Sequence, residues 1–208
     1  MTITTLTADS SDGERPLVAP TTKHVLPTAW WGMAVLITTE SMIFVILLSA
    51  YFFVRASSPQ WPPPGVPTPE LYLSLPFSFV LWGSSLPIFY AESAIKRGSQ
   101  AGLRLGLALS FAMGLAFVAF TIKDFNDLTF GWRDNAYGSL FYVIVGLHAI
   151  HVVLGLCMNL VVQVKAWQRK FGPDRHLTVD VFSLYWHFVD AVWIFVFLSL
   201  FVSEATRR

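Results

Sequence analysis

The sequence has few charged residues and a single cysteine. Charged side chains make up 13% of the 208 residues, about half the share found in a soluble domain. This low share, together with 54% hydrophobic residues, indicates a membrane protein. The formal net charge of +1 argues against nucleic acid as a partner. Cys157 alone excludes an internal disulfide and a multi-cysteine metal site, and its apolar surroundings predict a small buried side chain.

Residues 1–28 lack the basic start and apolar core of a secretory signal. They are rich in Thr, Ser and Pro, so we predict a polar tail over 1–28 followed by one domain over 29–208. The chain also lacks a phosphate-binding glycine-rich loop, a nucleophile elbow and paired catalytic carboxylates. No catalytic residue is therefore predicted.

Five apolar segments are long enough to cross a bilayer as helices, which takes about 20 residues. We predict spans at 30–54, 72–95, 103–122, 137–164 and 179–202. Helices satisfy their own backbone groups inside a membrane, and the alternation of a β-barrel strand is absent. The predicted fold class is all-α. The second span is the weakest because it contains Pro76, Pro87 and Glu92.

The basic residues predict an orientation. One side of the membrane would hold nine of them: Arg15, Lys23, Lys96, Arg97, Arg104, Lys165, Arg169, Lys170 and Arg175. The other side would hold five: Arg55, Lys123, Arg133, Arg207 and Arg208. Because an excess of Lys and Arg marks the cytoplasmic side, we expect the N-terminus inside and the C-terminus outside.

Ionisable side chains fall near the middle of three predicted spans. They are Glu40, His148, His151, His187 and Asp190. Such residues are rare within membranes, and they usually face the interior of a helix bundle and pair with one another. At about 1.5 Å per residue, all of them reach a similar depth. We therefore predict one network shared by three helices.

The spacing of polar residues supports inward-facing stripes. On the last span, steps of 3, 4 and 3 residues connect Asp180, Ser183, His187 and Asp190. On the fourth span, steps of 3, 4 and 4 connect His148, His151, Gly155 and Asn159. Residues at these intervals share one helix face, so both stripes are expected to contact other helices.

Three roles are open for these groups. Histidines from different helices suit a haem or metal site, although the Glu-x-x-His pairs of a di-iron bundle are absent. Glu and His chains also suit proton relays, but these groups gather at one depth and form no ladder. The residues favour a structural role, in which Glu40 pairs with a histidine and Asp190 is hydrogen-bonded across helices, so that the network specifies packing.

Other residues have simpler interpretations. Trp186 and Trp193, seven apart, are expected to pack against a neighbouring helix. Glu92 is expected to pair with Lys96 at i+4. A basic cluster after the fourth span is either an anionic-lipid site or a topological signal without a ligand; it contains Lys165, Arg169 and Lys170.

Four segments resemble subunit III of the haem–copper respiratory oxidases, closest to the cytochrome c oxidase type. They are "GMAVLITTESMIFVILLSAYFF" (32–53), "WPPPG" (61–65), "GLHAIHVVLG" (146–155) and "YWHFVDAVWIFVF" (185–197). The resemblance runs from about Trp30 to the end of the last span. It implies the short, five-helix form of the family, with two bundles around a V-shaped cleft that holds phospholipid.

The resemblance implies a non-catalytic subunit of a proton-pumping terminal oxidase in a bacterial plasma membrane. Such a subunit binds no metal or cofactor. It packs on catalytic subunit I, which carries the haems and copper, within a complex that includes subunit II. It is expected to sustain proton uptake and to protect the core from inactivation during turnover. The alternatives are subunit III of a quinol oxidase, an accessory subunit of nitric oxide reductase, and a stand-alone haem-binding membrane cytochrome.

The resemblance also suggests roles for residues. Glu40 matches the family's buried, carbodiimide-reactive glutamate, and His151 matches the histidine expected within about 2.7–3.2 Å of it. His187 and Asp190 match a pair in the family's last helix.

Two positions match residues near lipid in the family. Trp61 falls in the loop that borders the lipid cleft, and Lys165 falls where many members have an arginine at a lipid phosphate. The replacement loses bidentate phosphate recognition. The chain also departs from the family at Asp180, where glutamate is usual, and at Thr121, where glutamine is common.

Overall fold

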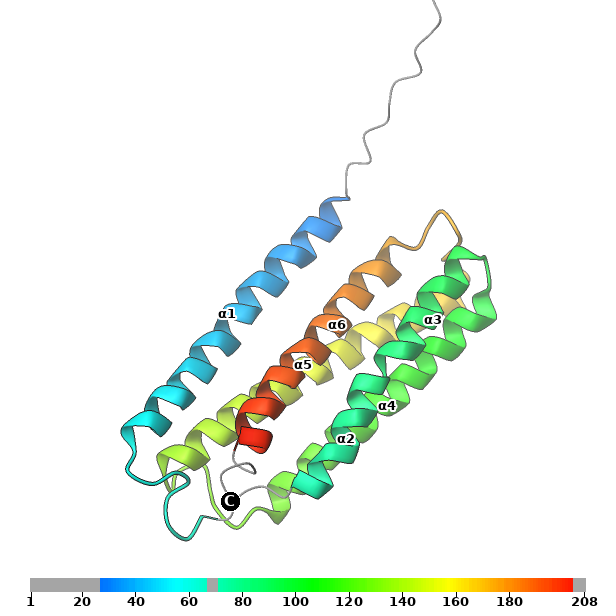
Figure 1. The fold of residues 1–208 in the computed structure, drawn as a ribbon. Helices are drawn as coiled ribbons and strands as arrows, with labels where there is room; N and C mark the ends of the chain where they lie inside the picture. Colours follow the sequence, from blue (N-terminus) through cyan, green and yellow to red (C-terminus); the bar gives the residue numbers. More distant parts are fainter. Residues whose placement is uncertain (1–26, 67–70, 204–208) are drawn as a thin grey trace, which may run out of the picture.

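The computed structural model describes residues 27–66 and 71–203. Most of the predicted tail lies outside the described residues, as do Arg15, Lys23, Arg207 and Arg208. The described chain forms an all-helical bundle (Figure 1). Its elements are α1 (Thr28–Ser57), α2 (Leu71–Gly83), α3 (Ser85–Lys96), α4 (Gln100–Asp127), α5 (Ala136–Trp167), α6 (Leu177–Phe197) and a π-helical turn, η1 (Leu198–Val202). The predicted all-α membrane fold is confirmed.

Within residues 27–66 and 71–203, four helical stretches are each long and apolar enough to cross a membrane: α1, α4, α5, and α6 continued by η1. The remaining predicted span, 72–95, is divided into α2 and α3, which follow one another along α4 (Figure 1). The break lies at Ser84, three residues before Pro87. Proline lacks an N–H and its ring clashes with the carbonyl of residue i−4, which here is Gly83. Pro87 thus accounts for the break within the predicted span, whereas Pro76 lies inside α2.

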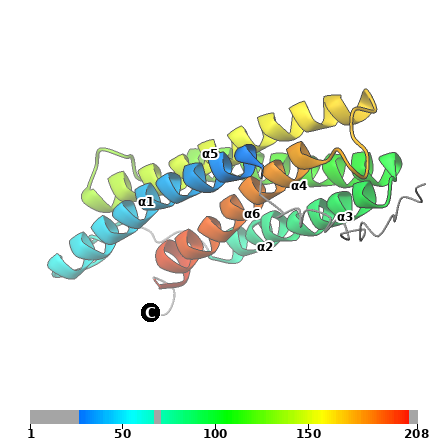
Figure 2. The same ribbon diagram turned by 90° about the horizontal axis from the view of Figure 1, so that it is seen from above.

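Helix α6 occupies the centre of the bundle. Seen from above, it lies between α1 and α5 on one side and α2 and α3 on the other (Figure 2). Helix α1 lies at the edge and packs against α5 and α6. In the most hydrophobic 18-residue stretch of α1, only 11% of the residues are buried inside the bundle, against 61% in the corresponding stretch of α6 with η1. Helix α1 therefore owes its position to a few contacts.

Glycines allow close packing at two places. The ring of Trp186 lies between Gly114 of α4 and Gly155 of α5, where added Cβ atoms would come within 2.8 and 3.0 Å of it. Gly106 of α4 lies against α3, where a Cβ would come within 2.4 Å of the Pro87 carbonyl oxygen. Small residues let membrane helices approach closely, and these glycines set the spacing of α4 against its neighbours.

Both ends of the bundle are tied by polar contacts. At one end, Arg55 of α1 donates to the Ser203 hydroxyl at 2.7 Å. At the other, Arg104 of α4 donates to the Ala166 carbonyl near the end of α5 at 3.1 Å, and Gln100 donates to the Phe171 carbonyl at 2.7 Å. The α3–α4 turn and the α5–α6 loop therefore lie together. This agrees with the predicted grouping of basic residues, while the side facing the cytoplasm stays a prediction.

Candidate functional site

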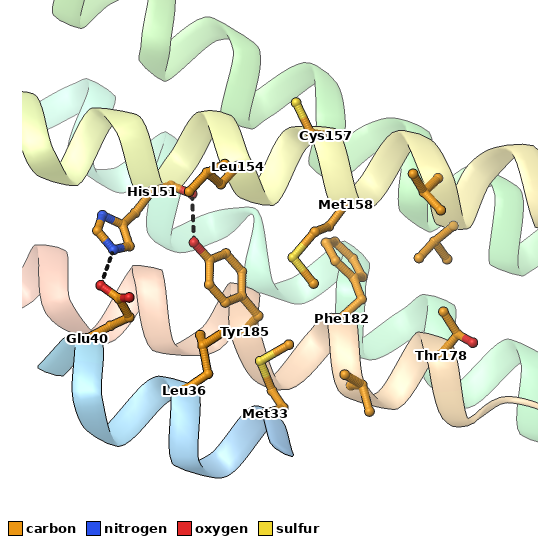
Figure 3. A pocket seen from close by; sticks show the side chains of 13 residues that line it. Met33, Leu36, Glu40, His151, Leu154, Cys157, Met158, Thr178, Phe182 and Tyr185 are labelled. Carbon is orange, nitrogen blue, oxygen red and sulfur yellow. Dashed lines mark hydrogen bonds and ion pairs between the residues drawn. The ribbon is translucent and has the colours of Figure 1, made fainter. Parts of the chain in front are cut away.

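The predicted pair of Glu40 and His151 is present between α1 and α5 (Figure 3). Glu40 Oε2 lies 3.2 Å from His151 Nε2. His151 Nδ1 donates to the Leu147 carbonyl at 2.8 Å, since a carbonyl oxygen can only accept. One further proton must lie between Nε2 and Oε2 for that contact to be a hydrogen bond. Whether this proton resides on oxygen or nitrogen, the pair is neutral overall, which reduces its cost within a membrane.

A groove extends from this pair between α1, α5 and α6 (Figure 3). It has a volume of about 460 Å³ and an almost wholly apolar lining. The lining residues are Met33, Leu36, Glu40, His151, Leu154, Cys157, Met158, Val161, Val162, Thr178, Val181, Phe182 and Tyr185. It runs along the second half of α5 toward the α5–α6 loop. Glu40 is partly exposed to it, with a side-chain exposure of 32%.

Two residues of the groove were not predicted to lie there. Cys157 was expected to be buried, but its side chain is exposed on α5 and lines the groove. Apolar surroundings in the sequence do not distinguish a helix face that meets protein from one that meets lipid. Tyr185, which carried no prediction of its own, donates its hydroxyl to the His151 carbonyl at 3.3 Å and joins α6 to the same site.

His187 and Asp190 do not join that pair. Ser85 of α3 lies between them: its hydroxyl donates to Asp190 Oδ2 and lies 2.9 Å from His187 Nδ1. Because a serine hydroxyl has one proton, His187 Nδ1 is the donor in the second contact. Phe89 stacks on the His187 ring with centroids 4.2 Å apart. Ser85 was missed because a single hydroxyl in an apolar span carries no pattern.

His148 forms a third, separate environment. It is fully buried, and its Nε2 donates to the Val189 carbonyl of α6 at 3.2 Å. The Trp193 ring packs on it at 4.6 Å between centroids. The prediction of one network across three helices is therefore wrong. Polar residues at a similar depth contact different helices, because α6 lies between α1 and α3.

The remaining members of the two stripes have partners near the helix ends and on α4. Asp180 accepts from His176 Nδ1 at 2.7 Å, at the first turn of α6, so it lies away from the middle of the span. Asn159 donates to Ser110 of α4 at 3.0 Å and accepts from Gln163 at 2.8 Å. As predicted, the stripes face other helices, except at Asp180, whose partner His176 caps the same helix.

The tryptophans of α6 pack against neighbours as expected, and they also form hydrogen bonds. Trp186 Nε1 donates to Ser84 at 2.8 Å, and Trp193 Nε1 donates to Ser78 at 3.0 Å. Together with Ser85, these serines connect α2 and α3 to α6. The ion pair expected between Glu92 and Lys96 is not found in the part of the chain that the structure describes.

The predicted lipid-contacting residues lie at opposite ends of the molecule. Trp61 donates to the Tyr51 hydroxyl at 3.2 Å and packs against Tyr137, at the start of α5. Lys165 is near the end of α5, about 42 Å away along the helix axis. It lies one turn beyond Val161, which lines the groove.

Arg169 and Lys170 belong to a different pocket. They are exposed in the α5–α6 loop, where a hollow of about 710 Å³ is also lined by Asp174 and Arg175. The four lipid candidates therefore do not form one site, and Lys165 is the one beside the groove.

The described residues show no cluster of potential metal ligands. They contain no group of three His, Cys, Asp or Glu side chains able to hold a metal ion. Both ring nitrogens of His151 are already hydrogen-bonded.

Known proteins show the same sequence pattern. The family model described as "Cytochrome c oxidase subunit III" matches residues 13–204. Proteins named cytochrome c oxidase subunit 3 from Synechocystis and Thermostichus vulcanus are 35% and 33% identical. The alignments cover 83% and 82% of this chain, and 74% and 85% of those relatives. A probable cytochrome c oxidase subunit 3 from Mycobacterium tuberculosis is 37% identical, over 82% of this chain and 85% of its own length.

Proposed function

Because the chain belongs to the cytochrome c oxidase subunit III family, we propose that it is a non-catalytic subunit of a proton-pumping terminal oxidase. It packs on the catalytic subunit that holds the haems and copper, in a bacterial plasma membrane with its N-terminus in the cytoplasm. Electrons from cytochrome c reduce oxygen in that partner. This chain sustains proton uptake and delays inactivation during turnover.

The observation that carries this proposal is the use of the polar groups inside the spans. Glu40 pairs with His151, Asp190 bonds Ser85 and His148 bonds the Val189 carbonyl. Each contact joins two helices of this chain. Groups engaged in this way specify packing, as expected of a scaffold.

Co-purification tests this proposal. When the complex is extracted through a tag on this chain, we expect a larger subunit containing haem and copper to elute with it in equal amount. Electron transfer from reduced cytochrome c to oxygen should accompany that fraction. The isolated chain should show no haem absorption band. Elution of the chain without a haem-containing subunit, or activity with quinol but not cytochrome c, would contradict the proposal.

We also propose that the groove holds one acyl chain of an anionic phospholipid of the inner leaflet; the family resemblance implies phospholipid in a V-shaped cleft between two bundles. Three features support this. The lining is apolar, the groove reaches the middle of the bundle at Glu40, and its other end approaches Lys165. A lysine near a membrane surface contributes about 1 kcal/mol to binding an anionic lipid.

Replacing Lys165 with Ala should lower the amount of retained anionic phospholipid about fivefold, since 1 kcal/mol corresponds to that factor. Native mass spectrometry of the complex measures it. Lys165→Arg should retain or increase the lipid, because guanidinium binds phosphate in a bidentate manner. Lys123→Ala is the matched control, because Lys123 is an exposed lysine near the C-terminal end of α4. Cys157→Trp, which places a large ring in the groove, should also expel the lipid. Equal retention in Lys165→Ala, Cys157→Trp and the control would exclude this site.

A further inference from the structure

A column of polar groups follows the contact between α3 and α6. Its deep end is Asp190 with Ser85 and His187. Its shallow end is Glu92, seven residues beyond Ser85 on α3, close enough to interact electrostatically with His187. At 1.5 Å per residue the column is about 10 Å long. This column lies on the side of α6 away from the groove and the Glu40–His151 pair.

The deep end of the column is incompletely satisfied. Asp190 is only 6% exposed. Within the described chain, neither its Oδ1 nor the Nε2 of His187 has a hydrogen-bond partner. Ser85 donates its single proton to Asp190 Oδ2, so it has nothing left for a second acceptor. A buried polar atom without a partner is unfavourable.

The shallow end carries an unpaired acid. Glu92 is partly exposed and lies about 6 Å deeper along α3 than Lys96. Over the residues that the structure describes, no cation lies within ion-pair distance of it. The column thus holds two acidic side chains without a lysine or arginine. By contrast, the predicted spans at 103–122 and 137–164 contain no acidic residue.

The surface beside the column is apolar and exposed. Leu86 is 70% exposed, and Phe89, which covers the His187 ring, is 52% exposed. Asp190 Oδ1 and His187 Nε2 are buried between α3 and α6 and do not reach this surface. Glu92 is partly exposed there, where it repels the phosphate of a lipid headgroup and favours a basic side chain of another protein. The combination of an apolar surface and an unpaired acid within a predicted span therefore favours a protein over a lipid.

We propose that the outer face of α3 and α6 docks a transmembrane helix of the neighbouring catalytic subunit, and that this helix places an arginine or lysine against Glu92. The identity of the neighbour rests on the proposed function. The charge of the acidic column selects a basic partner, and the exposed Leu86 and Phe89 supply the apolar contact on either side of it. Neither the groove nor the Glu40–His151 pair takes part in this contact.

Photocrosslinking in the assembled oxidase tests the docking face. The photoreactive amino acid benzoylphenylalanine replaces Leu86 on α3, and in separate control proteins it replaces Val45 on α1 or Ile150 on α5. These controls are 56% and 57% exposed and also lie within membrane-spanning helices. We expect position 86 to crosslink to the haem-containing subunit, and positions 45 and 150 to give at least tenfold less of that product.

A second variant tests the charge. Glu92→Gln should lower the yield of the position-86 crosslink about tenfold, because close charge pairs at interfaces contribute more than the 1.4 kcal/mol that corresponds to this factor. Asp174→Asn, which removes an acid from the α5–α6 loop, should leave it unchanged. A crosslink from position 86 to lipid alone or to a second copy of this chain overturns the proposal, as does capture of the haem-containing subunit from position 45 or 150. If no haem-containing subunit co-purifies at all, the proposed function itself fails.

Discussion

Replacing Gly106 with leucine should prevent stable folding of the bundle. A Cβ at this position would lie 2.4 Å from the Pro87 carbonyl oxygen and 2.8 Å from the Ala91 Cβ. Neither neighbour can move like the end of a flexible side chain, so α3 and α4 would have to separate. Overpacking of this kind costs about 1–3 kcal/mol and occasionally more. The yield of monodisperse protein and its melting temperature in nanodiscs measure the effect.

The control for Gly106→Leu uses another helical glycine. Gly32 of α1 has no neighbour within 4 Å of an added Cβ, so Gly32→Ala should leave stability unchanged or raise it, since alanine favours helix by up to about 1 kcal/mol. Gly106→Ala should show an intermediate loss. If Gly106→Leu gives a normal yield and the melting temperature of the wild type, the close approach of α3 and α4 is wrong.

A double-mutant cycle at Glu40 and His151 should show strong coupling. Each single change, Glu40→Ala or His151→Leu, leaves one polar group of the pair without its partner. Such a loss costs about 1–3 kcal/mol. The double variant removes both groups, so its cost should fall below the sum of the singles by about 1–2 kcal/mol. Unfolding of the purified complex in lipid measures these differences. Additive effects would show that the hydrogen bond contributes nothing.

The same variants distinguish a structural role of Glu40 from a catalytic one. In Glu40→Ala oxidase, we expect the initial rate of oxygen reduction to match the wild type, while activity declines earlier during continuous turnover. The reason is that the pair holds α1, an edge helix with few buried residues, onto α5. Thr39→Val is the matched control, since the Thr39 hydroxyl bonds its own helix at the Leu36 carbonyl. An immediate loss of all activity in Glu40→Ala would instead assign this glutamate a direct catalytic role.

The positions of the helices along the chain were predictable where one physical property, hydrophobicity, dominates. Runs of apolar residues predict helices because a membrane offers no other partner for backbone groups, and the positions of α1, α4, α5 and α6 follow from that. Pro87 signalled the break in the second span, but the sequence did not show whether the helix would end, bend or restart. That outcome depends on how α2 and α3 both pack along α4.

The polar groups were predictable as a set but not as pairs. Steps of three and four residues correctly indicated that His151, His187 and Asp190 face other helices. The partner of Glu40 came from family resemblance, while the partner of Asp190 was not foreseen. Ser85 appeared as one hydroxyl in an apolar segment, and hydroxyls in membrane helices often bond their own backbone, as Thr38 does.

The sequence by itself determined the fold class, the family and the approximate positions of the long apolar helices. All of these follow from composition, local spacing and motif order. Only the tertiary structure decided that Glu40 meets His151 beside an apolar groove, while His187 and Asp190 meet Ser85 on the opposite side of α6. The physical reason is that depth is a property of one helix, whereas pairing depends on the rotation of two. That rotation is set by close contacts such as Gly106 against Pro87 and Trp186 between Gly114 and Gly155.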